Sequence, residues 1–180
     1  MGGILMLQKI IKSAALVATL TMFSINIASA AVQTADEEVP VKEATKSLQK
    51  TSKEVFPIGS PNVNYAKYFT GKSYLYPMES GNGINVANVT FAPSCINNWH
   101  IHHGSCQILI GVGGVGWYQI WGQEPQKMTP GVSVTIPEGV KHWHGASKDS
   151  WFQHLSIMKE GEVSTEWLEP VNEAEYAKLK

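Results

Sequence analysis

The stretch Trp99-His100-Ile101-His102-His103-Gly104-Ser105-Cys106-Gln107 decides how this chain is interpreted. It brings three imidazoles and one amide oxygen into nine consecutive positions. His142, His144 and His154 follow, and the 180 residues contain no other histidine. Histidines that only cover a surface would be scattered along the chain. The clustering therefore predicts a single metal site.

Alternation along a β-strand explains how these side chains can meet. His100 and His102 would point to the same side of a strand, about 7 Å apart, so both can reach one cation. The turn at 103–105 reverses the chain, so Gln107 can reach the same side, while His142 must come from another strand. Three neutral imidazoles and an oxygen donor suit a first-row divalent metal with one or two positions left open.

The other three histidines have different expected roles. His154 lies on a strand expected over 151–158, and if its face lines the interior it supplies a general acid or base. The alternative for His154 is a core histidine bonded to the backbone. His103 has the opposite parity to His102 and is expected at the surface. His144 is expected either beside the metal or in solvent.

The bulk composition limits the class of protein. The chain is 43% hydrophobic and 16% charged with a net charge of −1, which fits one soluble globular domain. No basic run is present, which argues against a nucleic-acid partner. Sixteen glycines and nine prolines, with abundant Trp and Tyr, indicate a turn-rich β protein.

Residues 1–30 differ from the rest of the chain. Lys9 and Lys12 form a short basic region, 13–27 is largely apolar, and Ala28-Ser29-Ala30 fits a cleavage site. This is the layout of a secretory signal peptide. We therefore expect a periplasmic or secreted mature protein with no membrane-spanning segment. The alternative is a membrane anchor, for which the apolar run is short.

The next segment, 31–55, is charged, polar and poor in aromatic residues, which predicts a partly disordered linker. A folded domain is expected over 56–180, beginning near Phe56. Its short strands are expected at 73–78, 84–91, 99–102, 107–112, 115–121, 132–136, 151–158 and 163–168, with a terminal helix at 172–180 capped by Asn172. Many short strands separated by turns predict an all-β sandwich or barrel.

The chain has two cysteines, Cys95 and Cys106, which flank the first histidine strand. In an oxidising compartment they could form a disulfide. Equally, they could be two small buried apolar residues. The sequence leaves both interpretations open, because disulfide geometry is strict.

Both histidine segments resemble the sequence motifs of the cupin superfamily. The first motif is matched by His100, His102, Gln107 and Gly114. The second motif is matched by Gly131, Pro137, Gly139 and His142. Glutamine at 107 replaces the usual glutamate, Ser94 stands where the first motif begins with glycine, and Ala146 stands where asparagine is usual. The resemblance covers residues 65–170 and implies an all-β double-stranded β-helix (jelly-roll) barrel.

A narrower group is also similar: small bacterial monocupins that include manganese-dependent hydroxynitrile lyases and the cupin relatives of carboxymuconolactone decarboxylase. The similar segments are 68–72, 89–91, 98–100, 141–146 and 166–168. This resemblance implies the metal ligands His100, His102, Gln107 and His142, and places His154 near the substrate. It implies manganese as the metal, with iron or zinc as alternatives. The loop from His102 to Gln107 is one residue longer than in those lyases.

The glutamine bears on the reaction class. Because all four expected ligands are neutral, the metal would keep its full double positive charge and act as a strong Lewis acid. This favours lyase, decarboxylase or isomerase chemistry on a small organic substrate, and the resemblance implies a hydroxynitrile lyase type. The alternatives are a metal-dependent dioxygenase and a non-catalytic periplasmic module that binds a ligand or a metal. A homodimer is the expected assembly.

Overall fold

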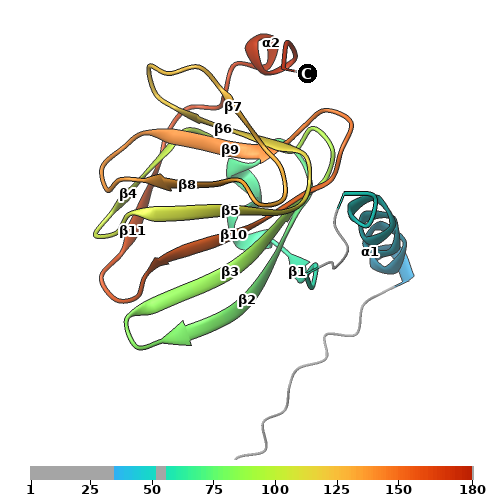
Figure 1. The fold of residues 1–180 in the computed structure, drawn as a ribbon, viewed down its shortest axis with the longest axis horizontal. Helices are drawn as coiled ribbons and strands as arrows, with labels where there is room; N and C mark the ends of the chain where they lie inside the picture. The colour runs from blue at the N-terminus through green and yellow to red at the C-terminus, as the bar shows by residue number, and fades with distance from the viewer. Residues whose placement is uncertain (1–34, 52–55, 180) are drawn as a thin grey trace, which may run out of the picture. The chain divides into compact units, whose positions relative to one another are not determined.

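The structure is a computed structural model that describes residues 35–51 and 56–179, so the expected signal peptide lies outside the described residues. Its core is a pair of antiparallel β-sheets (Figure 1). In order across the first sheet, the strands are β1 (Ser60–Pro61), β2 (Ser73–Gly81), β3 (Ile84–Phe91), β10 (Phe152–Lys159), β5 (Gln107–Gly114) and β8 (Ser133–Ile136). The second sheet has the order β11 (Ser164–Trp167), β4 (His100–His103), β9 (His142–Ala146), β6 (Gly116–Ile120) and β7 (Gln126–Met128).

The all-β class is confirmed, but the expected closed barrel is not formed. The six-stranded and five-stranded sheets share no strand, and no continuous ladder joins them within the described ranges. The expected strands from 73 to 168 all appear within a few residues of their predicted ends. Strands β1 and β7 were not predicted, because strands of two and three residues are too short to show a hydrophobic period. The 3₁₀ helix η1 (Val63–Tyr68) was not predicted either.

Side chains from both sheets form the core between them. Phe91, Leu109 and Phe152 point inward from the six-stranded sheet and are fully buried. They pack in one cluster with Met128 and Ala146 of the other sheet. The period of two along each strand therefore sets which residues reach the interior, and the histidines of β4, β9 and β10 follow the same rule.

The turn at Ser94 keeps the backbone geometry of the first cupin motif, although it lacks the glycine of that motif. Ser94, at the position where the motif begins with glycine, has a backbone φ of 64°. This left-handed conformation is the one that glycine adopts without strain. Ser94 Oγ donates to the carbonyl of Lys148 at 3.3 Å, and its own N–H donates to the carbonyl of Ser147. Hydrogen bonds therefore hold this turn, which precedes β4, in a conformation that glycine would adopt without strain.

The segment expected to be a linker contains helix α1 (Ala35–Leu48). Ala44 and Leu48 are fully buried and pack with Tyr74 and Trp151 of the β domain. Thr51 Oγ1 accepts a 2.7 Å hydrogen bond from the N–H of Gly114. Among residues 40–48 of α1, where burial is described, two apolar residues are fully buried within a charged stretch, so the amphipathic signal of this helix is weak.

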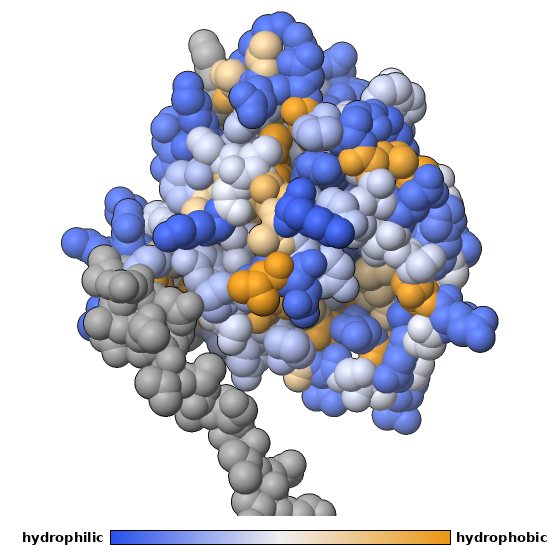
Figure 2. All heavy atoms as spheres, turned by 180° about the vertical axis from the view of Figure 1, so that it is seen from behind, coloured by the Kyte–Doolittle hydropathy of each residue, from blue (hydrophilic) through white to orange (hydrophobic). Residues whose placement is uncertain are grey.

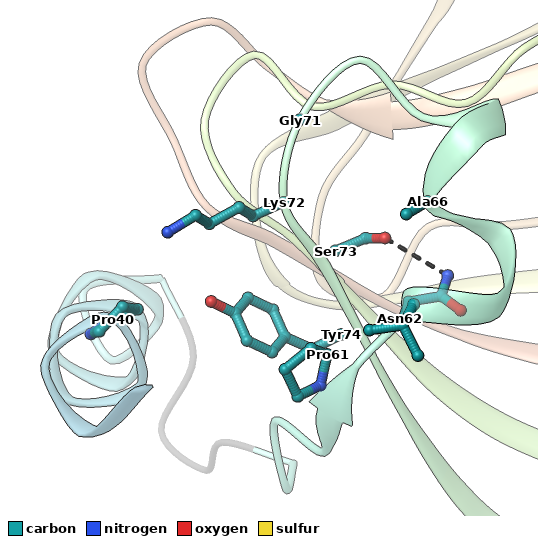
Figure 3. Close-up of a pocket in the computed structure, with 9 residues that line it drawn as sticks. Pro40, Pro61, Asn62, Ala66, Gly71, Lys72, Ser73 and Tyr74 are labelled. Atoms are coloured by element: carbon teal, nitrogen blue, oxygen red, sulfur yellow. Dashed lines mark hydrogen bonds between the residues drawn. The ribbon is translucent and has the colours of Figure 1, made fainter. Parts of the chain in front are cut away.

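A hollow of about 290 Å³ lies between α1, β1, η1 and the start of β2. In Figure 3 the Tyr74 ring points toward α1, and Asn62 faces Ser73 across the other side of the hollow. Asn62 Nδ2 donates to Ser73 Oγ at 3.3 Å. Apart from Lys72, its described lining residues are uncharged.

The terminal helix is confirmed as α2 (Glu173–Tyr176). Asn172 Oδ1 accepts from the N–H groups of Ala174 and Glu175, as an N-cap should. The segment around it covers the outer face of the five-stranded sheet, where Val171 packs with Trp99, Trp117 and Trp143.

The two cysteines are not paired in this structure. Cys95 is buried and Cys106 is exposed, and both are free thiols. Burial raises the pKa of the Cys95 thiol to about 12, so it behaves as a small apolar residue.

On the face of the molecule seen in Figure 2, apolar side chains lie in small separate groups among polar ones. None of the helices in residues 35–51 and 56–179 is long and apolar enough to span a membrane.

Candidate metal centre

Three histidines from two neighbouring strands converge at one point. His100 and His102 come from β4, and His142 on β9 stands directly opposite His100 in the ladder. All three are buried, and one ring nitrogen of each lies within 4.8 Å of those of the other two. Such a group can hold a metal ion, as the strand alternation predicted.

Hydrogen bonds to backbone carbonyls fix which nitrogen His100 and His142 offer. His100 Nδ1–H donates to the carbonyl of Asn98 and His142 Nδ1–H to the carbonyl of Val140, both at 2.9 Å. His102 Nδ1 lies 3.0 Å from the hydroxyl Oγ1 of Thr165 on β11. A carbonyl can only accept, so Nδ1 of His100 and of His142 carries the proton. A neutral imidazole with a proton on Nδ1 presents an unprotonated Nε2, which is the form that ligates a metal.

Gln107 completes the group from the other sheet. Its Nε2 donates to Ser156 Oγ at 2.9 Å, which leaves Oε1 directed at the histidines. Oε1 lies 3.0 Å from His142 Nε2. Gln107 is buried at the first position of β5, directly after the turn that includes Gly104.

These contacts fit a cation. His142 Nε2 and Gln107 Oε1 are both lone-pair acceptors once His142 Nδ1 holds its proton, so their 3.0 Å approach lacks a hydrogen between them. His102 Nε2 is buried with no hydrogen-bond partner. Buried polar atoms rarely remain unpaired. A divalent ion shared by these atoms would satisfy all of them, and three imidazoles plus an amide oxygen are suitable donors.

The environment keeps the imidazoles neutral. Burial, followed by the neighbouring histidines, holds the pKa of His100 well below its usual value. Burial lowers the pKa of His102 and of His142 to about 4. A metal ligand must be deprotonated, so near neutral pH the site needs no proton release from its histidines before an ion binds.

His154 and His144 form a second histidine pair behind the first group. His154 Nε2 lies 3.2 Å from His144 Nδ1, and both rings are buried. Asn97 holds His144 from the other side, because its Oδ1 accepts from the His144 backbone N–H at 3.0 Å. His154 packs against Phe91 and Phe152, and its Nδ1 has no partner. His154 therefore faces the interior, which was the condition for the acid–base role expected of it.

A pocket of about 140 Å³ opens onto the histidine group. Its described lining includes no formally charged side chain: Asn62, Tyr65, Phe69, Leu75, Val89, Asn97, His100, His102, Gln107, His144, Thr165 and Trp167. His144 reaches this lining whereas His154 does not, so His144 stands between His154 and the pocket. The sequence left the role of His144 open. The structure places His144 beside the three converging histidines.

Three aromatic side chains, Tyr65, Phe69 and Trp167, line the pocket. Trp167 stacks on Tyr68 with centroids 4.5 Å apart and lies 4.8 Å from the His100 ring. Tyr65 and Phe69 each lie 6.1 Å from Trp167. These residues come from β11 and from the η1 region, which were not singled out as site residues, because nothing in the sequence indicates that η1 folds over β11.

His103 lies outside the site. Its side chain is half exposed, and its Nε2 lies 2.9 Å from Glu166 Oε2. This agrees with its opposite parity to His102. Thr165, which holds His102, could have been suspected only if the pairing of β11 with β4 had been known.

Comparisons with known proteins agree with this fold and site. A Cupin domain family model matches residues 87–158. An (R)-mandelonitrile lyase from Granulicella tundricola is 33% identical over 115 residues, which is 62% of this chain and 87% of the lyase. A crystal structure of a cupin-like protein from Thermotoga maritima, also 33% identical, has a TM-score of 0.62 and covers 69% of this chain and 96% of its own.

The chain therefore belongs to the cupin superfamily and is a monocupin. Among curated proteins it is similar to a lyase, at an identity that establishes the family. The reaction is a separate question, which the residues of the site have to answer.

Proposed function

We propose that this chain is an exported, metal-dependent lyase of hydroxynitrile lyase type, which cleaves a small neutral cyanohydrin into a carbonyl compound and hydrogen cyanide. The observation that carries the proposal is the convergence of unprotonated acceptor atoms of His100, His142 and Gln107, with the unpaired Nε2 of His102, beside a pocket whose described lining is uncharged. The similarity to an (R)-mandelonitrile lyase supports the reaction. Export is proposed from the signal-peptide pattern of residues 1–30.

The ligand set supports a Lewis-acid role. His100, His102, Gln107 and His142 would hold one divalent ion, for which we propose manganese. When bound, such an ion acts as a Lewis acid toward an oxygen atom of the substrate. Since the four side chains are neutral, none of them offsets the charge of the ion.

The pocket supports a small neutral substrate with an apolar or aromatic substituent. Its lining offers Phe69, Leu75, Val89 and the Trp167 indole for an apolar group. Among the described lining residues there is no cation to pair with a substrate carboxylate and no anion to pair with an ammonium group. An uncharged aryl cyanohydrin such as mandelonitrile meets these conditions, and its small size suits a cavity of about 140 Å³.

We assign the proton step to His154 together with His144. The hydroxyl proton of the cyanohydrin passes to this pair, the bond between the carbinol carbon and the nitrile carbon breaks, and its electron pair leaves with cyanide. Cyanide then takes up a proton and leaves as hydrogen cyanide, while the former carbinol becomes a carbonyl. The 3.2 Å contact of His154 Nε2 with His144 Nδ1 supplies the path from the buried ring to the pocket.

The test is an assay of the manganese-loaded chain with mandelonitrile, followed by the absorbance of benzaldehyde. We expect turnover by the wild type and none by His100→Ala, which should lose the metal. His154→Asn should keep the metal and lose about 100-fold or more of the rate, the usual contribution of acid–base catalysis. His103→Ala is the matched control, because this exposed histidine lies outside the pocket, and its activity should be unchanged.

Other outcomes would contradict the proposal. If the loaded chain converts no cyanohydrin but the iron-loaded form consumes oxygen with an organic substrate, the protein is a dioxygenase. If mandelonitrile binds without conversion and His154→Asn binds it equally well, the site is a binding module.

A further inference from the structure

Asn97 lines the same pocket as His100, His102 and Gln107, and its side chain is only 2% exposed. Its orientation is fixed, because Oδ1 accepts from the backbone N–H of His144 at 3.0 Å, which the amide nitrogen could not do. The Nδ2 group therefore lies beside the His144 ring, 3.3 Å from its Nδ1 and 3.2 Å from its Nε2. Among the described residues, this ring is the only hydrogen-bond partner of Nδ2.

The Asn97 amide carries more hydrogens than the His144 ring can accept. Nδ2 has two hydrogens, whereas a neutral imidazole has one nitrogen that accepts and one that donates. If His144 Nδ1 accepts from His154 Nε2 across their 3.2 Å contact, its Nε2 carries the proton and neither nitrogen is open to Asn97. If His144 Nδ1 donates to His154, its Nε2 accepts one hydrogen from Asn97. In both tautomers at least one N–H of Asn97 has no acceptor.

The spare N–H of Asn97 is buried and held in place. The Asn97 backbone N–H donates to the His144 carbonyl at 3.1 Å, and Asn97 also forms a β-bridge with Phe69. A buried donor without an acceptor is costly, and such groups are rare in folded proteins. Because His144 and Phe69 also line the pocket, a molecule bound there lies beside this N–H and can supply the missing acceptor.

We propose that Asn97 Nδ2 binds the nitrile nitrogen of the cyanohydrin and holds it as cyanide leaves, an inference that rests on the proposed lyase function. A nitrile nitrogen accepts hydrogen bonds and has no hydrogen of its own, so it suits a side chain with an unused N–H. Other polar groups of the lining are already engaged. Gln107 uses its Nε2 on Ser156, and Thr165 Oγ1 contacts His102 Nδ1.

The hydrogen bond to Asn97 would strengthen during the reaction. As the bond between the carbinol carbon and the nitrile carbon breaks, its electron pair goes to the nitrile carbon and negative charge spreads to the nitrogen. A fixed N–H beside that nitrogen stabilises charge that develops only in the transition state. Asn97 keeps both of its amide hydrogens. The lone pair on carbon takes its proton from the histidine pair, so the product is hydrogen cyanide.

Steady-state kinetics of the manganese-loaded chain with mandelonitrile test the effect on the rate. Asn97→Leu keeps the approximate size of the side chain and removes the donor, so kcat should fall about 100-fold while KM stays within about threefold. Asn97→Asp keeps an oxygen for the His144 N–H but lacks the donor, and it should lose at least as much. Asn85→Leu, at an exposed position of β3, is the matched control and should keep the wild-type rate.

A binding measurement separates this role from a mere effect on pocket shape. Benzyl alcohol is mandelonitrile without its nitrile, so it probes the same pocket without the group that Asn97 would hold. Both ligands are titrated calorimetrically into metal-loaded His154→Asn, which should convert mandelonitrile only slowly. Adding Asn97→Leu should weaken mandelonitrile about fivefold, the effect of one lost hydrogen bond, and leave benzyl alcohol unchanged.

Several results would overturn the assignment. A wild-type kcat in Asn97→Asp would mean that Asn97 only holds His144, and equal losses of affinity for both ligands would mean that it only shapes the pocket. Circular dichroism and metal content show whether each variant is folded and loaded, and if Asn97→Leu is not, Asn97→Asp takes its place in both measurements. If the wild type converts no mandelonitrile while its binding still depends on Asn97, the lyase function fails and the donor assignment stands.

Discussion

At the scale of single residues, the atoms behind the histidines decide what the site can bind. Two backbone carbonyls and one hydroxyl hold the Nδ1 side of the three rings, so every Nε2 faces the same point. Gln107 adds an oxygen whose orientation Ser156 sets. The site is therefore organised as an acceptor group before any ion enters, which lowers the cost of binding one.

Thr165→Val tests this support. The substitution keeps the shape of the side chain but removes the oxygen that His102 Nδ1 contacts at 3.0 Å. Loss of such a partner should lower metal affinity about 10- to 100-fold. Ser164→Ala, at the exposed neighbouring position of β11, is the control. Metal titration that gives equal affinities for the two variants would show that Thr165 does not position the ligand.

Gln107→Glu tests the importance of neutral ligands. Ser156 Oγ can donate to a carboxylate where it now accepts from the amide, so the change should be tolerated. The added negative charge should tighten metal binding and reduce Lewis acidity, so we expect metal affinity to rise and cyanohydrin turnover to fall by about tenfold or more. Full turnover in this variant would mean that the neutral glutamine is not important for the reaction.

At the scale of elements, the turn between β4 and β5 sets how Gln107 meets the histidines. Gly104 has φ +83°, and its N–H donates to Glu138 Oε1 at 2.7 Å. A Cβ on Gly104 would lie only 2.3 Å from the carbonyl oxygen of Glu162. The turn therefore needs glycine for its conformation and also for the close approach of another backbone.

Gly104→Ala should consequently destabilise the chain more than the same substitution at a glycine that also has a positive φ but has free space around it. Gly122 is the matched control, with φ +78° and nothing within 4 Å of an added Cβ. We expect Gly122→Ala to cost about 1 kcal/mol in the free energy of unfolding, and Gly104→Ala to cost about 2 kcal/mol more. Urea unfolding measures both, and equal losses would contradict the backbone clash.

Strands such as 84–91 and 107–112 could be predicted because turns bound them, and the second extends to Gly114 in the structure. Parity indicated that His100 and His102 share one side of their strand and that His103 lies on the other, but it left open whether the face of His154 lines the interior. Neither α1 nor the contact of Thr165 with His102 could be predicted, because both depend on pairing between distant segments that no local period records. Barrel closure failed as a prediction for the same reason.

At the scale of the whole molecule, five buried histidines make stability depend on pH. Burial lowers the folded pKa of His102, His142 and His154 to about 4 from the ordinary value of 6.5. As pH falls below 6.5 the unfolded chain takes up protons that the folded chain refuses, so the free energy of unfolding decreases until about pH 4. Each such histidine contributes a slope of up to about 1.4 kcal/mol per pH unit.

Urea unfolding of the metal-stripped chain between pH 7 and pH 4 checks this slope. His142→Gln should make it shallower, because one titrating group is removed, whereas His103→Ala should leave it unchanged because that histidine is exposed. A free energy of unfolding that does not fall with pH in this window would show that burial does not lower the folded pKa of these rings.

The metal content of the purified chain tests the metal centre most directly, when it is measured by elemental analysis after equilibration with manganese, iron or zinc and removal of free ions. We expect one divalent ion per chain in the wild type and in His154→Asn, and almost none in His100→Ala or His142→Ala. A wild type that holds none of the three metals, or a His100→Ala variant that holds as much metal as the wild type, would contradict the assignment of these ligands.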